Sequence, residues 1–142
     1  MSAEHTSTIR VRWADVDPAG IAFYPRFFEW YDLGSEELFA SLGLPWPEMF
    51  PKYEIAGVPI VESGSTFTSP VRYGDVLTLR SAVVWVKTTT FRMEHTISVG
   101  ARRCASGFEV CAWVARPATP GGPLATRPIP DEVARKLKGG SA

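Results

Sequence analysis

The chain of 142 residues is poor in cysteine and histidine, with two of each. Cys104 and Cys111 are too few and wrongly spaced for a zinc site, and they are expected to be reduced thiols. His5 lies in an N-terminal segment expected to fray, which leaves only His95 in the body of the domain. A histidine-based triad or metal cluster is therefore nearly excluded, no metal is expected, and acid–base chemistry should fall to carboxylates.

Long apolar runs and an excess of one charge are also missing. No apolar stretch approaches the roughly 18 residues of a membrane helix, and residues 1–8 show no signal-peptide pattern. The 15 Lys and Arg residues balance 15 Asp and Glu residues, so the total charge does not indicate nucleic acid or an anionic membrane as a partner. These absences predict a cytoplasmic protein with neither kind of partner.

The neutral total hides an uneven distribution of charge. Residues 1–71 contain 4 basic and 10 acidic side chains, whereas residues 72–142 contain 11 basic and 5 acidic ones. The first half thus carries a net charge of −6 and the second half +6. Because one domain of this size is small for an enclosed site, we expect a pocket shared between subunits, with the two halves meeting at the interface.

Hydrophobic periodicity predicts a single α+β domain over residues 1–142, with a flexible tail at residues 1–7. Pro25 suits the first turn of one long helix, and Gly43 suits its end. The helix should cover one face of an antiparallel sheet whose open edge favours dimerisation. The expected order is a strand at 8–14, a helix at 25–42, an irregular connection at 44–53, strands at 58–69, 76–87, 90–99 and 109–116, with a turn at 102–107, and an irregular segment with a short helix at 118–142.

The segment best suited to chemistry runs from Asp15 to Pro25. It places Asp17 in a tight loop that leads into the N-terminus of the long helix, where free N–H groups and the helix dipole are partly positive. A thioester or ester carbonyl at that end would be polarised, and Asp17 could attack it or activate water. Alternatively, Asp17 is only a helix cap or turn residue, although it lies eight residues before Pro25. Gly20 is explained equally by a positive φ angle and by close approach of a substrate.

The run Asp17-Pro-Ala-Gly-Ile-Ala-Phe-Tyr-Pro25 resembles the signature of the 4-hydroxybenzoyl-CoA thioesterase family, which has the hotdog fold. The resemblance covers roughly residues 9–115 and includes three later motifs in the expected order: Trp30-Tyr31-Asp32, Gly57-Val58-Pro59-Ile60-Val61 and Tyr73-Gly74-Asp75-Val76-Leu77-Thr78. It implies a five-stranded antiparallel sheet wrapped around one long helix, in dimers that pair into tetramers. It also implies an acyl-CoA substrate and no cofactor, because coenzyme A is part of the substrate.

The resemblance implies roles for three residues. Asp17 matches the catalytic carboxylate, which acts as a nucleophile through a mixed anhydride or as a general base. Tyr24 matches the residue whose backbone N–H polarises the thioester carbonyl, and Asp32 matches the acceptor of the phenolic hydroxyl of a 4-hydroxybenzoyl group. Asp32 lies about 12 Å beyond Tyr24 along a helix, which suits two ends of one pocket. As an Asp on a helix, it could equally be a solvated surface charge.

Further pocket residues are expected on the same helix start and on the first strand after it. The residues expected to bind the acyl group, besides Asp32, are Gly20, Phe23, Pro59, Ile60 and Val61. Glu29, Glu36 and Glu62 are rival carboxylates, and His95, within a strand, is expected to be structural.

The phosphates of coenzyme A require positive charge near the pocket mouth, and arginine presents paired donors to phosphate. The basic second half offers candidates at or near its expected turns: Lys87, Arg92, Arg102 and Arg103. The turn after Trp85 reads Val-Lys-Thr-Thr-Thr and is less basic than in the family that the chain resembles.

These observations lead to the hypothesis of an acyl-CoA thioesterase that hydrolyses an aromatic thioester, in the first place 4-hydroxybenzoyl-CoA. Two alternatives stay open. One is the same reaction on another aryl or a short aliphatic acyl group, and the other is a non-catalytic acyl-CoA-binding protein.

Overall fold

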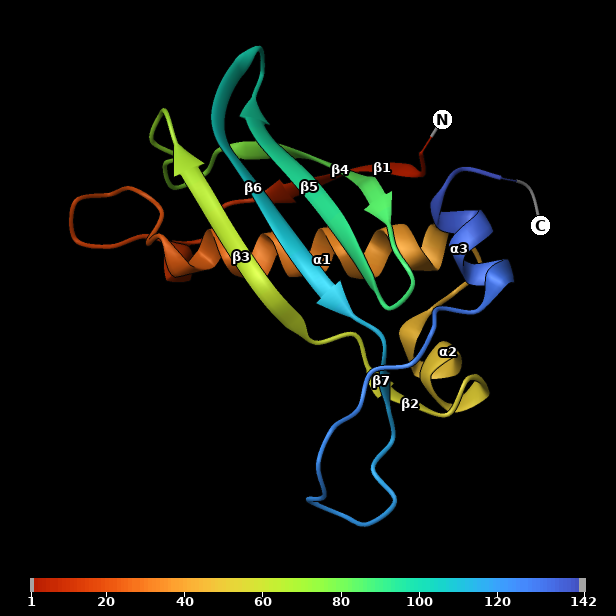
Figure 1. Ribbon diagram of the computed structural model, residues 1–142. Helices are drawn as coiled ribbons and strands as arrows, with labels where there is room; N and C mark the ends of the chain where they lie inside the picture. Colours follow the sequence, from red (N-terminus) through yellow and green to blue (C-terminus); the bar gives the residue numbers. More distant parts are fainter. Residues whose placement is uncertain (1, 141–142) are drawn as a thin grey trace.

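The computed structural model describes residues 2–140 of the chain (Figure 1). One long helix and a five-stranded sheet make up most of this region, and shorter elements gather at the C-terminal end of the long helix. In chain order the elements are β1 (Glu4–Arg10), a 3₁₀ turn (Trp13–Asp15), α1 (Pro25–Ser41), α2 (Trp46–Lys52), β2 (Ile55–Gly57), β3 (Ile60–Phe67), β4 (Val76–Val86), β5 (Thr90–Val99), β6 (Arg102–Ala112), β7 (Val114–Ala115) and α3 (Asp131–Leu137).

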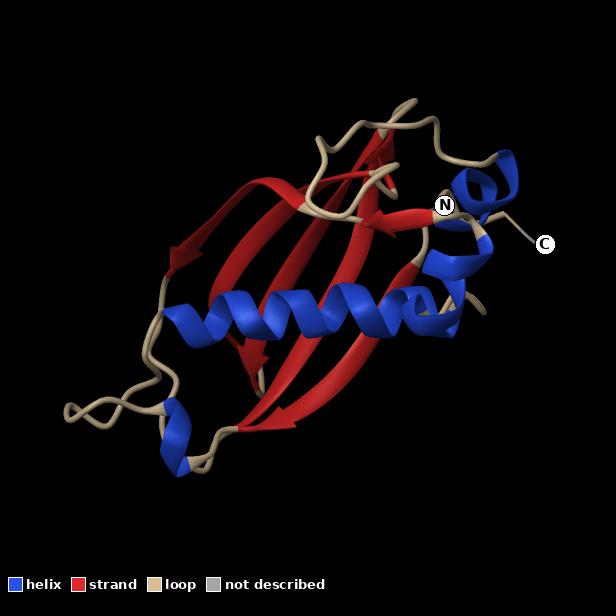
Figure 2. Ribbon diagram, turned by 90° about the horizontal axis from the view of Figure 1, so that it is seen from below, coloured by secondary structure: helices blue, strands red, loops and turns tan. Residues whose placement is uncertain are grey.

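The large sheet is antiparallel throughout and has the strand order β1-β4-β5-β6-β3. α1 crosses one face of this curved sheet (Figure 2). Residues of β4 alternate between the two faces, so that Leu77, Leu79 and Val83 are buried while Val84 is exposed. The sheet with a helix on one face is the α+β architecture that the sequence predicts.

α1 packs on the sheet through one side only. It begins at Pro25, whose missing N–H is not needed in the first helical turn, and it is followed by Gly43 with a φ of +77°. The buried positions recur every three or four residues, which defines one helix face. They are Phe27, Trp30, Tyr31, Gly34, Ser35, Leu38 and Phe39.

A smaller layer closes the C-terminal end of α1. β2 pairs with β7 to form a short ribbon beside α2. α3 buries Val133 and Leu137 in the same apolar cluster as Phe39 and Trp113. Within residues 2–140, no helix has both the length and the apolar character that a membrane span requires.

The first strand differs from its expected position. β1 comprises Glu4–Arg10 instead of residues 8–14, so the expectation of a flexible tail does not hold for residues 4–7. Pairing with β4 stops where that strand begins, at Val76, and the chain then leaves the sheet and turns at Trp13–Asp15. Residues 4–8 are mainly polar because β1 is an edge strand, which hid the strand from a hydrophobic pattern.

Two other segments are more regular than the sequence suggests. The turn expected at Arg102–Gly107 is wrong, because β6 begins at Arg102 and pairs with β5 from there. The reversal is confined to Gly100 and Ala101, and Gly100 supplies the positive φ of +58°. In the connection at residues 44–53, the sequence allows for one short helical turn, and the structure has the seven-residue helix α2.

Candidate active site at the start of α1

Asp17 lies half-buried at a tight turn just before α1. Its Oδ1 accepts a hydrogen bond from the Ala19 N–H at 2.8 Å, and its carbonyl accepts one from the Gly20 N–H at 2.8 Å. Gly20 has a φ of +81°, and apart from Gly20 and its two chain neighbours no residue of 2–140 has an atom within 4 Å of where a Cβ would be. The backbone conformation therefore accounts for the glycine. Asp17 caps its own turn, not the helix, and among residues 2–140 its Oδ2 has no hydrogen-bond donor.

A buried carboxylate holds the base of this loop. Asp15 is 3% exposed, and its Oδ2 accepts a hydrogen bond from the Arg12 N–H at 2.8 Å. The carbonyl of Asp15 accepts a second hydrogen bond from the Phe23 N–H, also at 2.8 Å. Arg26 of α1 lies 3.8 Å from the Asp15 carboxylate. Asp15 thus connects the start of the loop at Arg12 with its end at Phe23, and it contacts Arg26 in the first turn of α1.

An apolar cavity of about 380 Å³ opens beside the N-terminus of α1. Its lining comes from the end of the loop, the start of the helix and the segment after β3: Ile21, Ala22, Tyr24, Phe27, Phe67, Thr68, Ser69, Pro70 and Val71. Asp17 lies outside this lining but is adjacent to it, since its N–H donates to the Ile21 carbonyl at 2.9 Å. The Tyr24 N–H makes no backbone hydrogen bond within residues 2–140. A free donor at a helix N-terminus is suited to stabilise negative charge on a carbonyl oxygen.

Asp32 lies on α1, about 12 Å further along the helix than Tyr24. Although its side chain is exposed overall, partial burial of the carboxyl group raises the pKa of Asp32. The negative charges of Glu109 and Glu36 raise it further, while His95 lowers it. Asp32 is thus exposed on the helix surface, and charged groups beneath α1 act on its carboxyl group.

The two groups of expected acyl-pocket residues lie apart. Phe23 is 49% exposed and packs edge-on against Tyr24 at the start of α1. Ile60 and Val61, at 46% and 61% exposed, begin β3, whereas Phe67 at the other end of β3 lines the cavity. The two ends of β3 are seven residue steps apart, about 23 Å along an extended strand. Ile60 pairs with Cys111, whose pKa is raised to about 12 by burial and by the charges of Glu109 and Asp32. Ile60 and its neighbour Pro59 are thus on the Asp32 side of the molecule.

Comparison with known proteins identifies the family. Residues 11–137 match the thioesterase-like superfamily. The chain belongs to this superfamily. It is 32% identical to 4-hydroxybenzoyl-CoA thioesterase from Pseudomonas sp. (strain CBS-3) over 99 residues, which cover 69% of the chain and 70% of that protein. The solved structure of that enzyme superposes with a TM-score of 0.84 at 26% identity, covering 92% and 96% of the two chains.

Other members act on related compounds. The structure of a gentisyl-coenzyme A thioesterase superposes with a TM-score of 0.80 at 32% identity, covering 91% of this chain and 98% of that one. A 1,4-dihydroxy-2-naphthoyl-CoA hydrolase from Synechococcus sp. (strain WH7803) is 25% identical over 107 residues, covering 71% of this chain and 70% of that protein. The family, the hotdog fold and the enzyme class that the sequence predicts are thereby confirmed.

The basic residues expected to bind coenzyme A do not form one cluster in this thioesterase. Arg102 donates to Ser69 Oγ and to the Pro70 carbonyl, both in residues that line the apolar cavity. Lys87 lies at the opposite end of the sheet, in the turn between β4 and β5, with its Nζ 4.5 Å from the centre of the Trp85 ring.

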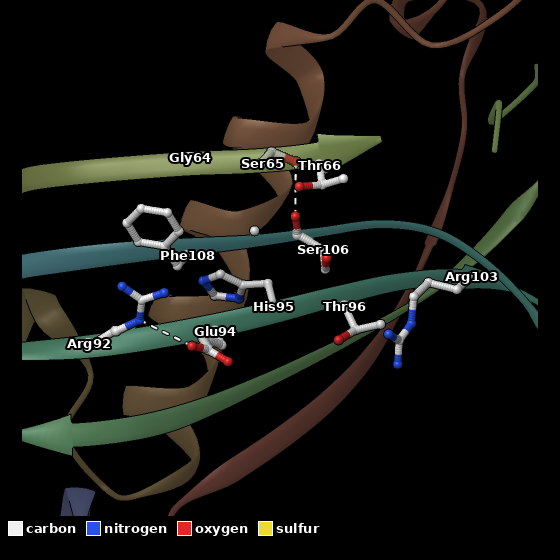
Figure 3. Close-up of a pocket in the computed structure, with 11 residues that line it drawn as sticks. Gly64, Ser65, Thr66, Arg92, Glu94, His95, Thr96, Arg103, Ser106 and Phe108 are labelled. Atoms are coloured by element: carbon white, nitrogen blue, oxygen red, sulfur yellow. Dashed lines mark hydrogen bonds and ion pairs between the residues drawn. The ribbon is translucent and has the colours of Figure 1, made fainter. Parts of the chain in front are cut away.

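Arg92 and Arg103 line a hollow of about 610 Å³ on the face of the sheet that points away from α1 (Figure 3). Arg92 lies 4.0 Å over the Phe108 ring and pairs with Glu94 at 3.1 Å. Arg103 lies at the other end of the hollow (Figure 3). The hydroxyl groups between the two arginines belong to Thr66, Thr96 and Ser106, whereas the Ser65 hydroxyl lies 2.7 Å from the Tyr31 hydroxyl on the α1 side of the sheet.

The rival carboxylates are less suited to the chemistry than Asp17. Glu29 is bound to Arg26 at 2.7 Å, and Glu62 is exposed on the edge strand β3. Glu36 lies on the exposed side of α1. Residues 2–140 contain no group of three or more His, Cys, Asp or Glu side chains that could hold a metal ion.

Sequence reasoning missed a buried polar group under α1. His95 is 1% exposed and its Nε2 lies 2.9 Å from Oε1 of Glu109, which is 2% exposed. Ser35 of α1 donates to the same oxygen at 2.6 Å. The strand pattern could have indicated this pair, because His95 and Glu109 both occupy inward positions in strands that are otherwise apolar on that side.

Proposed function

We propose that this thioesterase hydrolyses hydroxylated aromatic acyl-CoA thioesters, with 4-hydroxybenzoyl-CoA as the leading candidate, to the free acid and coenzyme A. The observation that carries the proposal is the position of the Asp17 turn, directly beside an apolar cavity at the N-terminus of α1. The names of the relatives support the substrate class, because the 4-hydroxybenzoyl, gentisyl and 1,4-dihydroxy-2-naphthoyl groups are all hydroxylated aromatic acyl groups.

The proposed chemistry uses one carboxylate and the backbone of the helix start. The Tyr24 N–H would bind the thioester carbonyl oxygen and stabilise the negative charge that develops on it. In one route, Asp17 Oδ2 attacks the carbonyl carbon, the carbon–sulfur bond breaks, and the thiolate of coenzyme A leaves and takes a proton from solvent. Water then hydrolyses the mixed anhydride to the acid and regenerates Asp17. In the other route, Asp17 removes a proton from water, which attacks the carbonyl directly. Neither route needs a metal or a cofactor.

Asp32 is proposed to recognise the hydroxyl of the acyl group. An ionised carboxylate accepts a hydrogen bond from a phenol, and its distance of about 12 Å along the helix from Tyr24 suits an aryl group between them. Gly20 and Phe23 are proposed at the carbonyl end, and Pro59, Ile60 and Val61 at the Asp32 end. The cations proposed to contact the phosphates are Arg102, nearest the cavity, and Lys87, Arg92 and Arg103 elsewhere on the sheet.

Self-association is proposed to complete the site. The edge strand β3 exposes Ile60, Val61 and Phe67 to solvent, whereas the other edge, β1, is mainly polar. An unpaired apolar edge is suited to pair with a second copy of the same strand. Such pairing would cover the residues proposed for the acyl pocket, and dimers could then pair into tetramers.

The experiment is a thiol-trapping assay on a panel of acyl-CoA substrates: 4-hydroxybenzoyl-, benzoyl-, gentisyl-, 1,4-dihydroxy-2-naphthoyl- and hexanoyl-CoA. The proposal expects kcat/KM to be highest for a hydroxylated aryl substrate and at least tenfold lower for benzoyl-CoA. Equal or higher activity on hexanoyl-CoA would contradict the proposed substrate class. Tight binding of all substrates without release of thiol would contradict catalysis and favour an acyl-CoA-binding protein.

A further inference from the structure

The polar group under α1 divides the core of the molecule. One apolar cluster contains Leu38, Val83 and Met93, and the other contains Tyr31, Leu79 and Ile97. In each of the three elements that supply these residues, a buried polar side chain lies between the two clusters: Ser35 in α1, Ser81 in β4 and His95 in β5. Together with Glu109 of β6 they form a continuous hydrogen-bonded belt, which we call the polar belt.

The belt is completely enclosed and its hydrogen bonds are well formed. Glu109 Oε1 accepts from Ser35 at 2.6 Å and lies 2.9 Å from His95 Nε2. The other ring nitrogen of His95, Nδ1, lies 2.8 Å from Ser81 Oγ. A serine hydroxyl can either accept a hydrogen bond from a protonated Nδ1 or donate one to an unprotonated Nδ1. The Ser81 hydroxyl can therefore satisfy Nδ1 in either tautomer of His95.

Neighbouring residues are shaped to accommodate this belt. Tyr31 stacks on the His95 ring with 5.1 Å between ring centres and 12° between planes. Gly34 lets α1 approach, because a Cβ at this position would lie 2.3 Å from Ser81 Oγ and 3.2 Å from His95 Nδ1. A glycine within a helix is destabilising relative to alanine, and buried charges gain little stability over apolar residues of the same volume. Stability alone does not account for the belt.

The belt lies next to Asp32. Ser35, which donates to Glu109, is one helical turn beyond Asp32 on α1, and residues three apart on a helix are neighbours. The groups that act on the Asp32 carboxyl are Glu36 on its own helix, Glu109 on β6 and His95 on β5. Cys111 of β6 is the fourth titratable group nearby. Two of these groups, Glu109 and His95, belong to the belt and act on Asp32 in opposite directions.

We propose that the Glu109–His95 pair is a positioning element that sets the charge state of Asp32 and thereby the preference for hydroxylated acyl groups. The inference rests on the proposed function of Asp32. Glu109 supplies a fixed negative charge that makes Asp32 a stronger proton acceptor toward a phenolic hydroxyl. His95 acts on Asp32 in the opposite direction. Ser35, Ser81 and Tyr31 hold the pair in place and exclude water from it.

The test measures the titration midpoint of the Asp32 carboxyl carbon by ¹³C NMR in the full-length protein, without substrate. Glu109→Gln keeps the shape of the side chain and removes its charge, so the midpoint is expected to move to lower pH. His95→Gln removes the imidazole that lowers the pKa of Asp32, so the midpoint is expected to move to higher pH. Glu36→Gln, on the same helix, calibrates the effect of one nearby carboxylate, and Glu48→Gln on α2 is expected to leave the midpoint unchanged. If Glu109→Gln does not fold, His95→Gln alone tests the inference, with the Asp32 midpoint expected to move to higher pH instead of lower pH.

The ratio of kcat/KM for 4-hydroxybenzoyl-CoA to that for benzoyl-CoA is then followed against pH in the same variants. The inference expects the pH at which this ratio falls to shift in the same direction as the NMR midpoint. An unchanged NMR midpoint in both belt variants would overturn the inference. A shifted NMR midpoint with an unchanged pH profile of the ratio would overturn the role of Asp32 in recognition, and with it the link from the belt to specificity.

Discussion

The carbonyl oxygen of Asp15 accepts a hydrogen bond from the Phe23 N–H at 2.8 Å, and this bond closes the loop that carries Asp17. The side chain of Asp15 meanwhile binds the Arg12 N–H at 2.8 Å. One buried residue therefore fixes where the loop leaves the sheet and where it enters α1. The position of Asp17 relative to the helix start depends on this anchor.

Replacing Asp15 by alanine should lower both stability and activity. The loss of a buried acceptor for the Arg12 N–H is expected to cost about 1–3 kcal/mol of unfolding free energy. Displacement of the loop is expected to lower kcat by about tenfold or more, with a smaller effect on KM, because small misplacements of a reacting group are costly. Urea unfolding and steady-state kinetics measure the two effects. Glu29→Ala, which removes an exposed partner of Arg26, is the matched control and should change neither.

Selectivity for hydroxylated substrates should depend on pH through Asp32. Its raised pKa means that this carboxyl takes up a proton at a higher pH than an ordinary aspartate as the pH falls. The ionised form accepts the phenolic hydroxyl, so the preference for 4-hydroxybenzoyl-CoA over benzoyl-CoA should be present above that pKa and lost below it. The ratio of the two kcat/KM values cancels effects common to both substrates. Asp32→Ala should show a low ratio at every pH, and a large ratio in this variant would refute the assignment.

The exposed edge strand β3 is predicted to form the interface between two copies of the chain, so a charge placed on it should weaken self-association. Val61 is 61% exposed on this edge, so Val61→Lys would place like charges close together if two copies of β3 pair. Light scattering after size-exclusion chromatography should show the wild type as a dimer or tetramer and the variant with a lower mass. Val84→Lys, at a 44% exposed position of the interior strand β4, is the control and should not change the mass. A monomeric wild type would contradict the proposed pairing.

Much of the fold could be predicted because the type and order of its main elements follow from local sequence patterns. Period-two strands and the segment from Pro25 to Gly43 predict a helix on an antiparallel sheet, and α1 at Pro25–Ser41 lies within one residue of the expected end. The sequence predicts the first strand at residues 8–14 instead of Glu4–Arg10, because an edge strand needs apolar residues on one face at most and residues 4–8 are mainly polar. The sequence predicts a turn at the start of β6 because the residues there are small or charged, whereas in the structure Arg102 and Arg103 are exposed and Gly107 lies beneath Tyr31.

The candidate site could be predicted only in part. The neighbourhood of Asp17 and Tyr24 is local in sequence, and a loop before a helix brings them together whatever the rest of the chain does. The cavity wall from Phe67 to Val71, the Arg102 contacts and the Glu109–His95 pair all depend on which strands are neighbours. Strand order and register are set by packing of the whole sheet, which spacing along the chain does not reveal.

The most direct test of the account is the kcat/KM for 4-hydroxybenzoyl-CoA of Asp17→Asn compared with that of Asp75→Asn. Both residues cap their own turns through a backbone N–H at 2.8 Å, so the pair separates the loss of a catalytic carboxylate from the loss of a turn cap. The account predicts a fall of about 100-fold or more for Asp17→Asn, with substrate affinity retained, and near wild-type activity for Asp75→Asn. Turnover by Asp17→Asn within about threefold of the wild type would contradict it.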